Sequence, residues 1–141
     1  HGVEQIIEQA AKQDGKPGCG LETLDEQLEL LDSLPAEEQL EVLLQSLEES
    51  KDIEEEMKRL FDAWQDGDDE PLARQLEEEF ADYPELADRL IYARNERWAG
   101  QLAALLEQPD DVLVVVGALH LVGKQGLPAK LERRGFRIER R

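Results

Sequence analysis

The sequence has little of several things on which folds and sites depend. It contains one cysteine, Cys19, in 141 residues, which excludes an intrachain disulfide and a multi-cysteine zinc site. We expect Cys19 to be a small residue of the core. Only 5% of the residues are aromatic. No apolar stretch approaches the roughly 20 residues that are needed to span a bilayer.

Positive charge is also scarce. The sequence contains 16 lysines and arginines and 34 acidic residues, which gives a net charge of −18. Such a surface repels the phosphates of nucleic acid and anionic lipid, so we exclude a nucleic-acid partner. With 35% charged and 40% hydrophobic residues, the composition is typical of a helix-rich protein with solvated charged faces. The length fits a single domain over residues 1–141.

The most apolar stretch of the chain is Asp-Val-Leu-Val-Val-Val-Gly-Ala-Leu-His, residues 111–120. Its β-branched run predicts a strand that is buried on both faces, as in a parallel sheet flanked by helices. Gly117 permits a sharp turn where this strand ends. His120 then lies at the carboxyl edge of the sheet, where α/β proteins build their sites.

Helical spacing and capping signals dominate the rest of the chain. A helix is predicted over 3–13, with Gly15 ending it, and the pair Thr23 and Glu26 forms a capping box that starts another. Helical spacing continues over 35–65 with a bend near 48–52, and prolines open further helices. Shorter patterns predict strands at 18–22 and 136–140 and a helix at 127–134.

These elements predict a strongly helical α/β fold with a small, mostly parallel sheet of about three strands. A long helical insertion occupies 35–82, and residues 84–141 form a helix-strand-helix-strand unit. Three strands make a thin sheet, and no strand precedes the first helix. We therefore expect a sheet that is incomplete in this chain or completed by another copy, and self-association through its uncovered edge.

Glu22 and His120 are the first candidates for a site. If their strands are parallel neighbours, both side chains emerge at the same sheet edge. An acid and an imidazole there could ligate a divalent metal ion, or act as a base and its orienting partner. Taken singly, His120 also suits a hydrogen-bonded turn, and Glu22 suits an acid that is favoured by a helix N-terminus.

Arg94 and Asn95 are the second pair of candidates. On a helix, Arg94 shares a face with Leu90 and Trp98, and burial of its charge there is unfavourable without a partner. Either the guanidinium extends to solvent, or it pairs with Glu22 or with an anionic group of a substrate. Asn95 could donate hydrogen bonds to the same region.

Three stretches together resemble the TraB/GumN family, which includes the PrgY pheromone-shutdown proteins and the Tiki proteases. They are Gly-Leu-Glu-Thr at 20–23, Ala-Arg-Asn-Glu-Arg-Trp at 93–98, and Val-Val-Gly-Ala-Leu-His-Leu at 115–121, followed by Gly-Leu at 126–127. The resemblance implies an α/β core related to the erythromycin-esterase and ChaN-like folds, with two Gly-x-x-His motifs. It also implies peptide chemistry, because Tiki members are metal-dependent proteases and PrgY-like members limit pheromone activity.

In the family pattern Glu22, Arg94, Asn95, Gly117 and His120 match, whereas the first Gly-x-x-His motif is not in this sequence. The resemblance therefore implies the C-terminal part of a metal-dependent, peptidase-like hydrolase that acts on a peptide or protein. His120 and Glu22 would be metal ligands or acid–base groups, and the chain alone would be inactive. The alternative is a non-enzymatic module that binds a peptide or protein, with a structural His120. For the full-length protein the resemblance suggests an extracytoplasmic location.

Overall fold

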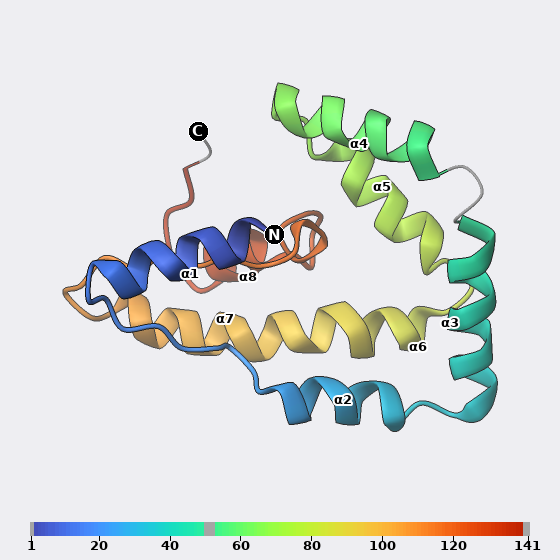
Figure 1. Cartoon of the computed structure of the whole chain (residues 1–141), viewed down its shortest axis with the longest axis horizontal. Helices are drawn as coiled ribbons and strands as arrows, with labels where there is room; N and C mark the ends of the chain where they lie inside the picture. The colour runs from blue at the N-terminus through green and yellow to red at the C-terminus, as the bar shows by residue number, and fades with distance from the viewer. Residues whose placement is uncertain (1, 50–52, 140–141) are drawn as a thin grey trace.

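The computed structural model describes residues 2–49 and 53–139. All the regular structure in this part of the chain is helical (Figure 1). The elements are α1 Val3–Gln13, α2 Leu24–Asp32, α3 Ala36–Glu49, α4 Ile53–Asp66, α5 Glu70–Glu79, α6 Pro84–Ala87, the π-helical turn η1 Asp88–Tyr92, α7 Ala93–Leu106, the 3₁₀ turn η2 Ala118–His120 and α8 Leu127–Arg133.

Short-range signals set the helix boundaries as predicted. The amide of Glu26 donates to Thr23 Oγ1 at 3.2 Å, and the Glu26 carboxylate accepts from the Thr23 amide at 2.6 Å, which is the predicted capping box. Gly15 follows α1 with a φ of +65°, and Gly135 follows α8 with a φ of +94°, so both helices end at residues that tolerate a left-handed backbone. The bend was predicted near 48–52. Residues 48 and 49 form the end of α3, and 50–52 lie outside the described residues.

The predicted α/β fold is wrong, because the described residues contain no strand and no sheet. The stretches 18–22, 111–117 and 136–139 are not helical, but none pairs with another segment of the described chain. We call residues 112–116 the valine segment. Within residues 2–49 and 53–139, its backbone groups form no hydrogen bond with the backbone of another segment. A strand requires a neighbour that completes its ladder, and hydrophobic patterning cannot show whether that neighbour is present.

The valine segment is mostly exposed, and only Val116 is partly buried, against the cluster that contains Trp98. Leu113 exposes 74% of its surface, and Val112, Val114 and Val115 are also exposed. The prediction of a strand buried on both faces is therefore wrong for the chain as described. The apolar composition shows that the segment is suited to burial. It does not show that another element of the described chain covers it.

The core lies instead where one nearly continuous helix, formed by α6, η1 and α7, packs against its neighbours. Helix α7 packs on α8, and α5 packs on η2. The long helix runs horizontally through the middle of Figure 1. Two buried apolar clusters result: Trp98, Ala99, Leu102 and Leu127 in one, and Leu76, Ile91 and Val122 in the other.

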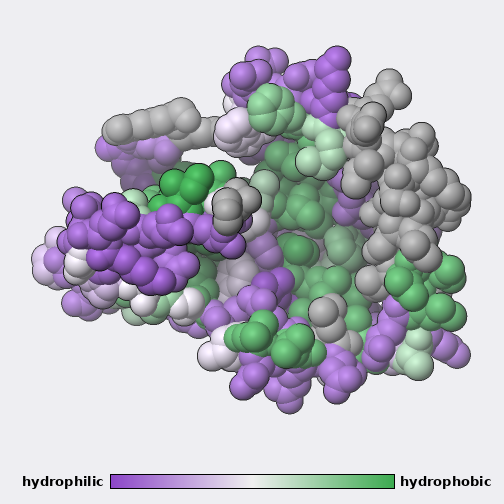
Figure 2. Space-filling view, viewed as in Figure 1, coloured by the Kyte–Doolittle hydropathy of each residue, from purple (hydrophilic) through white to green (hydrophobic). Residues whose placement is uncertain are grey.

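Helices α1, α3 and α4 present apolar side chains to solvent, including Ile6, Leu43 and Trp64. In Figure 2 hydrophobic side chains gather in the recessed middle of the face, and hydrophilic ones dominate its left-hand part. None of the helices among residues 2–49 and 53–139 is long and apolar enough to cross a membrane.

Candidate functional site

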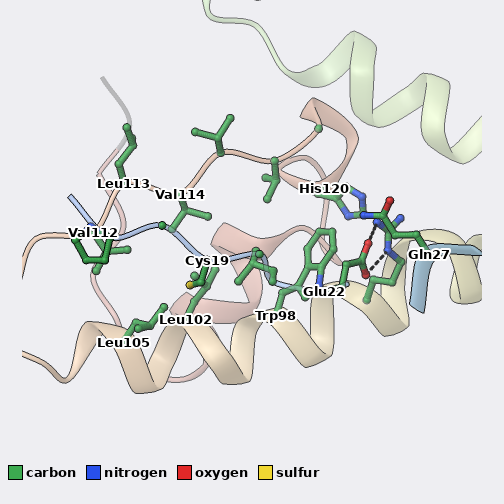
Figure 3. A pocket seen from close by; sticks show the side chains of 18 residues that line it. Cys19, Glu22, Gln27, Trp98, Leu102, Leu105, Val112, Leu113, Val114 and His120 are labelled. Carbon is green, nitrogen blue, oxygen red and sulfur yellow. Dashed lines mark hydrogen bonds and ion pairs between the residues drawn. The ribbon is translucent and has the colours of Figure 1, made fainter. Parts of the chain in front are cut away.

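A cleft of about 480 Å³ connects the regions that carry the candidate residues. Residues 17–22 line it on one side and 112–117 on another, and Trp98 and Leu102 of α7 form its floor. Val112 lies toward one end of the cleft, whereas Glu22 and His120 lie near the other (Figure 3). The structure therefore brings Glu22 and His120 to one place without a sheet.

Arg94 pairs with Glu22, which is one of the alternatives that the sequence left open. Its Nε donates to Glu22 Oε2 at 3.1 Å, and its Nη2 donates to Glu22 Oε1. The third contact runs from Nη1 to the carbonyl of Leu90, at 2.9 Å, within the π-helical turn. The guanidinium carbon also lies 4.7 Å from the centroid of the Trp98 ring, a cation–π distance.

Glu22 is held on two sides. Its side chain is only 6% exposed, and Arg97 Nη2 lies 3.6 Å from Oε2. The turn before it leaves no room for a side chain at Gly20, where a Cβ would lie 2.7 Å from the carbonyl oxygen of Glu22. The bidentate pair with Arg94 thus attaches the segment before α2 to α7 through a charge-assisted contact.

His120 closes the 3₁₀ turn after Gly117, with its amide donating to the Gly117 carbonyl at 3.0 Å. The residue is 7% exposed, and its ring centroid lies 4.6 Å from that of Trp98. Its Nδ1 lies 2.7 Å from Oδ1 of Asn95, which is fully buried. The imidazole is therefore fixed by a partner from α7.

The hydrogen bonds of Asn95 identify the tautomer of His120. Asn95 Nδ2 donates to the carbonyl of Gln125 at 2.8 Å, so the oxygen of the amide must be the atom that faces the imidazole. An amide oxygen only accepts, and Nδ1 of the neutral ring must then carry the proton. Nε2 keeps its lone pair, and within the described part of the chain it has no hydrogen-bond partner.

The surroundings keep this imidazole uncharged. The pKa of His120 is lowered from 6.5 to about 4, mainly by burial and also by the positive charge of Arg94, while Glu22 opposes the shift. His120 is therefore neutral at pH 7, and Nε2 can accept a proton or bind an electrophile.

Comparison with known proteins agrees with the three stretches that carry the resemblance. The model of the TraB/PrgY/gumN family matches residues 1–140. The chain belongs to this family. It is 30% identical over 131 residues to the uncharacterised protein YbaP of Escherichia coli (strain K12) and to YbaP of Shigella flexneri, covering 93% of this chain and 48% of each relative. The chain thus spans about half the length of these curated relatives. No solved structure gave a significant match.

Of the two ligands that the resemblance implied for a metal ion, Glu22 and His120, only His120 has surroundings that suit a ligand. A neutral imidazole whose Nδ1–H is held by an amide oxygen is the arrangement that ligand histidines adopt. The Glu22 carboxylate, in contrast, is balanced by Arg94 and Arg97. Among the described residues, no group of three His, Cys, Asp or Glu side chains is placed to hold a metal. His120 and Glu22 alone therefore do not fit a metal ion.

Lys130 and Gln125 support the candidate site and were not predicted from the sequence. Lys130 on α8 is 6% exposed, and its Nζ donates to Glu96 Oε2 at 2.8 Å and to Gln125 Oε1 at 3.0 Å. A lysine in a short helix is typically exposed, and no spacing relates it to Glu96, so the sequence contains no signal for this burial. Cys19, which was expected in the core, is exposed and lines the cleft.

Proposed function

We propose that this chain supplies the histidine and arginine part of a peptide-bond hydrolase site. The observation that carries the proposal is the free Nε2 of His120, which is held by a buried amide beside a cleft that can accommodate a short stretch of peptide. Because the curated relatives are about twice as long as the matched region, the activity is proposed for a protein of their full length.

The residues suggest a simple division of labour. Water attacks the carbonyl carbon of the peptide bond and transfers a proton to His120 Nε2, which then protonates the leaving amine. Arg94 uses three of its five N–H donors on Glu22 and Leu90, and the remaining two can stabilise the developing oxyanion. Glu22 is a positioning residue that fixes the guanidinium.

The surroundings of His120 in this chain favour inactivity of the chain by itself. Burial and Arg94 lower the pKa of His120 to about 4, which makes it a weak base at pH 7, so we expect no measurable peptide hydrolysis until the rest of a full-length protein changes these surroundings. A divalent metal ion, as the resemblance implied, would require ligands in addition to His120 and other than Glu22.

The test is peptide hydrolysis by a protein of full family length that carries this chain. His120→Gln should reduce the rate by about 100-fold or more, while His1→Gln, which changes the other histidine, should leave it unchanged. Metal content measured for both variants shows whether His120 is a ligand. An unchanged rate in His120→Gln overturns the proposal, and hydrolysis by the 141-residue chain that depends on His120 overturns the predicted inactivity.

The second candidate is a peptide-binding module without catalysis, in which His120 is structural. The exposure of the valine segment along the cleft favours it, because an apolar, unpaired backbone can hold an extended peptide. Calorimetric binding of peptides that survives His120→Gln, with no cleavage, would support this function over hydrolysis.

We also propose that the chain self-associates through the valine segment. Exposed Leu113 and Val115 provide apolar surface, whereas the net charge of −18 opposes contact between copies. Light scattering should therefore show association that increases with salt and that Leu113→Ser with Val115→Ser abolishes. A monodisperse monomer at every salt concentration would contradict the proposal.

A further inference from the structure

Lys130 of the short helix α8 is buried, which is unusual for a lysine. It is buried in the interface between α7 and α8, and two oxygen acceptors lie within 3.0 Å of its ammonium group. Removing a lysine charge from water is costly unless hydrogen bonds replace the solvent. One acceptor, Glu96, is an exposed carboxylate that Arg134 also contacts, so the burial of Lys130 is not needed to neutralise it.

The other acceptor leads to the candidate site. Gln125 offers its side-chain oxygen to Lys130 and its backbone carbonyl to Asn95 Nδ2. Asn95 in turn presents its oxygen to His120 Nδ1. Lys130 is thus connected to the imidazole through two intermediate residues, each contact between 2.7 and 3.0 Å long.

The loop that carries Gln125 is closely folded, so the position of its carbonyl depends on a few contacts. At Gly126 a Cβ would lie 2.6 Å from the carbonyl oxygen of Val122 and 2.9 Å from the backbone of Leu121. Gln125 itself is exposed and therefore has little packing to hold it. The backbone of this loop is also held by Arg133 Nη1, which donates to the Lys124 carbonyl at 2.8 Å, whereas the bond from Lys130 restrains the Gln125 side chain itself.

We propose that Lys130 is a positioning residue for His120. By holding Gln125, it keeps the Gln125 carbonyl opposite Asn95 Nδ2, which keeps the Asn95 oxygen facing Nδ1 and selects the tautomer that leaves Nε2 unprotonated. The inference deepens the proposed function, but its test needs no substrate. Its failure would leave the hydrolysis proposal standing, and the reverse also holds.

The experiment measures the tautomer of His120 by ¹H–¹⁵N NMR of the 141-residue chain at pH 7. The sequence contains only two histidines, so a His1→Gln background leaves one imidazole to observe. In this background the two ring nitrogens should give widely separated ¹⁵N shifts, with Nδ1 protonated. Lys130→Met, which keeps the length of the side chain, should narrow the separation toward that of a mixture of tautomers.

Arg134→Met is the matched control. Arg134 contacts the same Glu96 carboxylate but is not the residue that holds the Gln125 side chain, so it tests the view that Lys130 only links α7 to α8. We expect Arg134→Met to leave both ¹⁵N shifts unchanged. Gln125→Ala removes the acceptor and keeps the backbone carbonyl, and it should reproduce the effect of Lys130→Met.

The outcomes separate the two roles. Unchanged shifts in Lys130→Met, or equal changes in Lys130→Met and Arg134→Met, overturn the proposal. If circular dichroism shows that Lys130→Met is unfolded, Gln125→Ala decides alone: a shift toward the mixture supports the positioning role, and unchanged shifts overturn it.

Discussion

The connection between α7 and α8 contains two halves that behave in opposite ways. The valine segment, residues 112–116, is the most apolar stretch of the chain, and all of it except the half-buried Val116 is exposed. The following residues 117–126, which we call the anchored loop, are richer in glycine and polar groups, yet His120, Val122 and Gly126 in it are buried. Apolarity alone therefore does not decide which part of this connection enters the core.

The difference lies in the partners that each half finds. In the anchored loop, Gln125 accepts hydrogen bonds from Asn95 and Lys130, and Val122 packs in a buried cluster. The valine segment has no such donors opposite it and no neighbouring strand in the described chain. Burial requires an element that covers the apolar surface and satisfies the backbone at the same time.

The largest expected effect on stability is the difference between truncating a buried leucine next to the anchored loop and truncating an exposed leucine of the valine segment. Leu127, just after the anchored loop, is 2% exposed and belongs to a buried cluster, so Leu127→Ala should lower the free energy of unfolding by about 3–4 kcal/mol. Leu113→Ala should change it by less than about 0.5 kcal/mol. Urea denaturation of both variants measures the difference. Equal losses would mean that the valine segment is buried in solution.

Removing the Asn95 amide should make the anchored loop as mobile as the valine segment. Asn95→Leu keeps much of the side-chain volume but leaves the Gln125 carbonyl and His120 Nδ1 unpaired, a loss of about 3 kcal/mol in unfolding free energy. Hydrogen exchange of the anchored loop should then approach that of the valine segment. Slow exchange that persists in this variant would show that packing, rather than the amide, holds the loop.

The backbone segments around Gly126 in the anchored loop approach each other closely. Gly126→Ala places a methyl group against the Leu121 and Val122 backbone and should reduce the unfolding free energy by about 2–3 kcal/mol. Gly123 has a φ of +70° with open space around it, so Gly123→Ala should lose only about 1 kcal/mol from backbone strain. Thermal unfolding compares the two, and a larger loss at Gly123 would contradict the close approach of the backbone around Gly126.

Local signals allowed part of this molecule to be predicted. The bounds of α1 and the capping box of α2 depend on residues within one helical turn, and they were predicted correctly. The bidentate pair of Arg94 and Glu22 could be anticipated because a charge on an apolar helical face needs a partner. In contrast, the predicted sheet failed because pairing depends on a distant or absent neighbour.

The structure brings together the candidate residues that the sequence singled out, but the residues that support them could not be predicted. His120 stood out because a rare residue followed a glycine at the end of an apolar run. Lys130 and Gln125 gave no signal, since each is bonded to residues about 30 or more positions away or across a loop. The tautomer of His120 follows only when the Asn95 amide is placed opposite two specific groups.

The smallest expected effect is on the pH dependence of stability, which reports how well the anchored loop shields His120 from solvent. Folding lowers the pKa of His120 to about 4 from its ordinary 6.5, so between these values the unfolded chain binds more protons than the folded one. The stability contributed by the neutral imidazole is complete above pH 6.5 and is lost as the pH falls toward 4.

His120→Gln isolates this contribution, because the many carboxylates that also titrate at acidic pH are common to both proteins. Between pH 7 and pH 5 the wild-type chain should lose about 2 kcal/mol more unfolding free energy than the variant. Urea titrations at several pH values measure the difference. If the unfolding free energies of the two proteins change in parallel with pH, His120 is exposed to solvent in the folded chain. The anchored loop would then be no better buried than the valine segment.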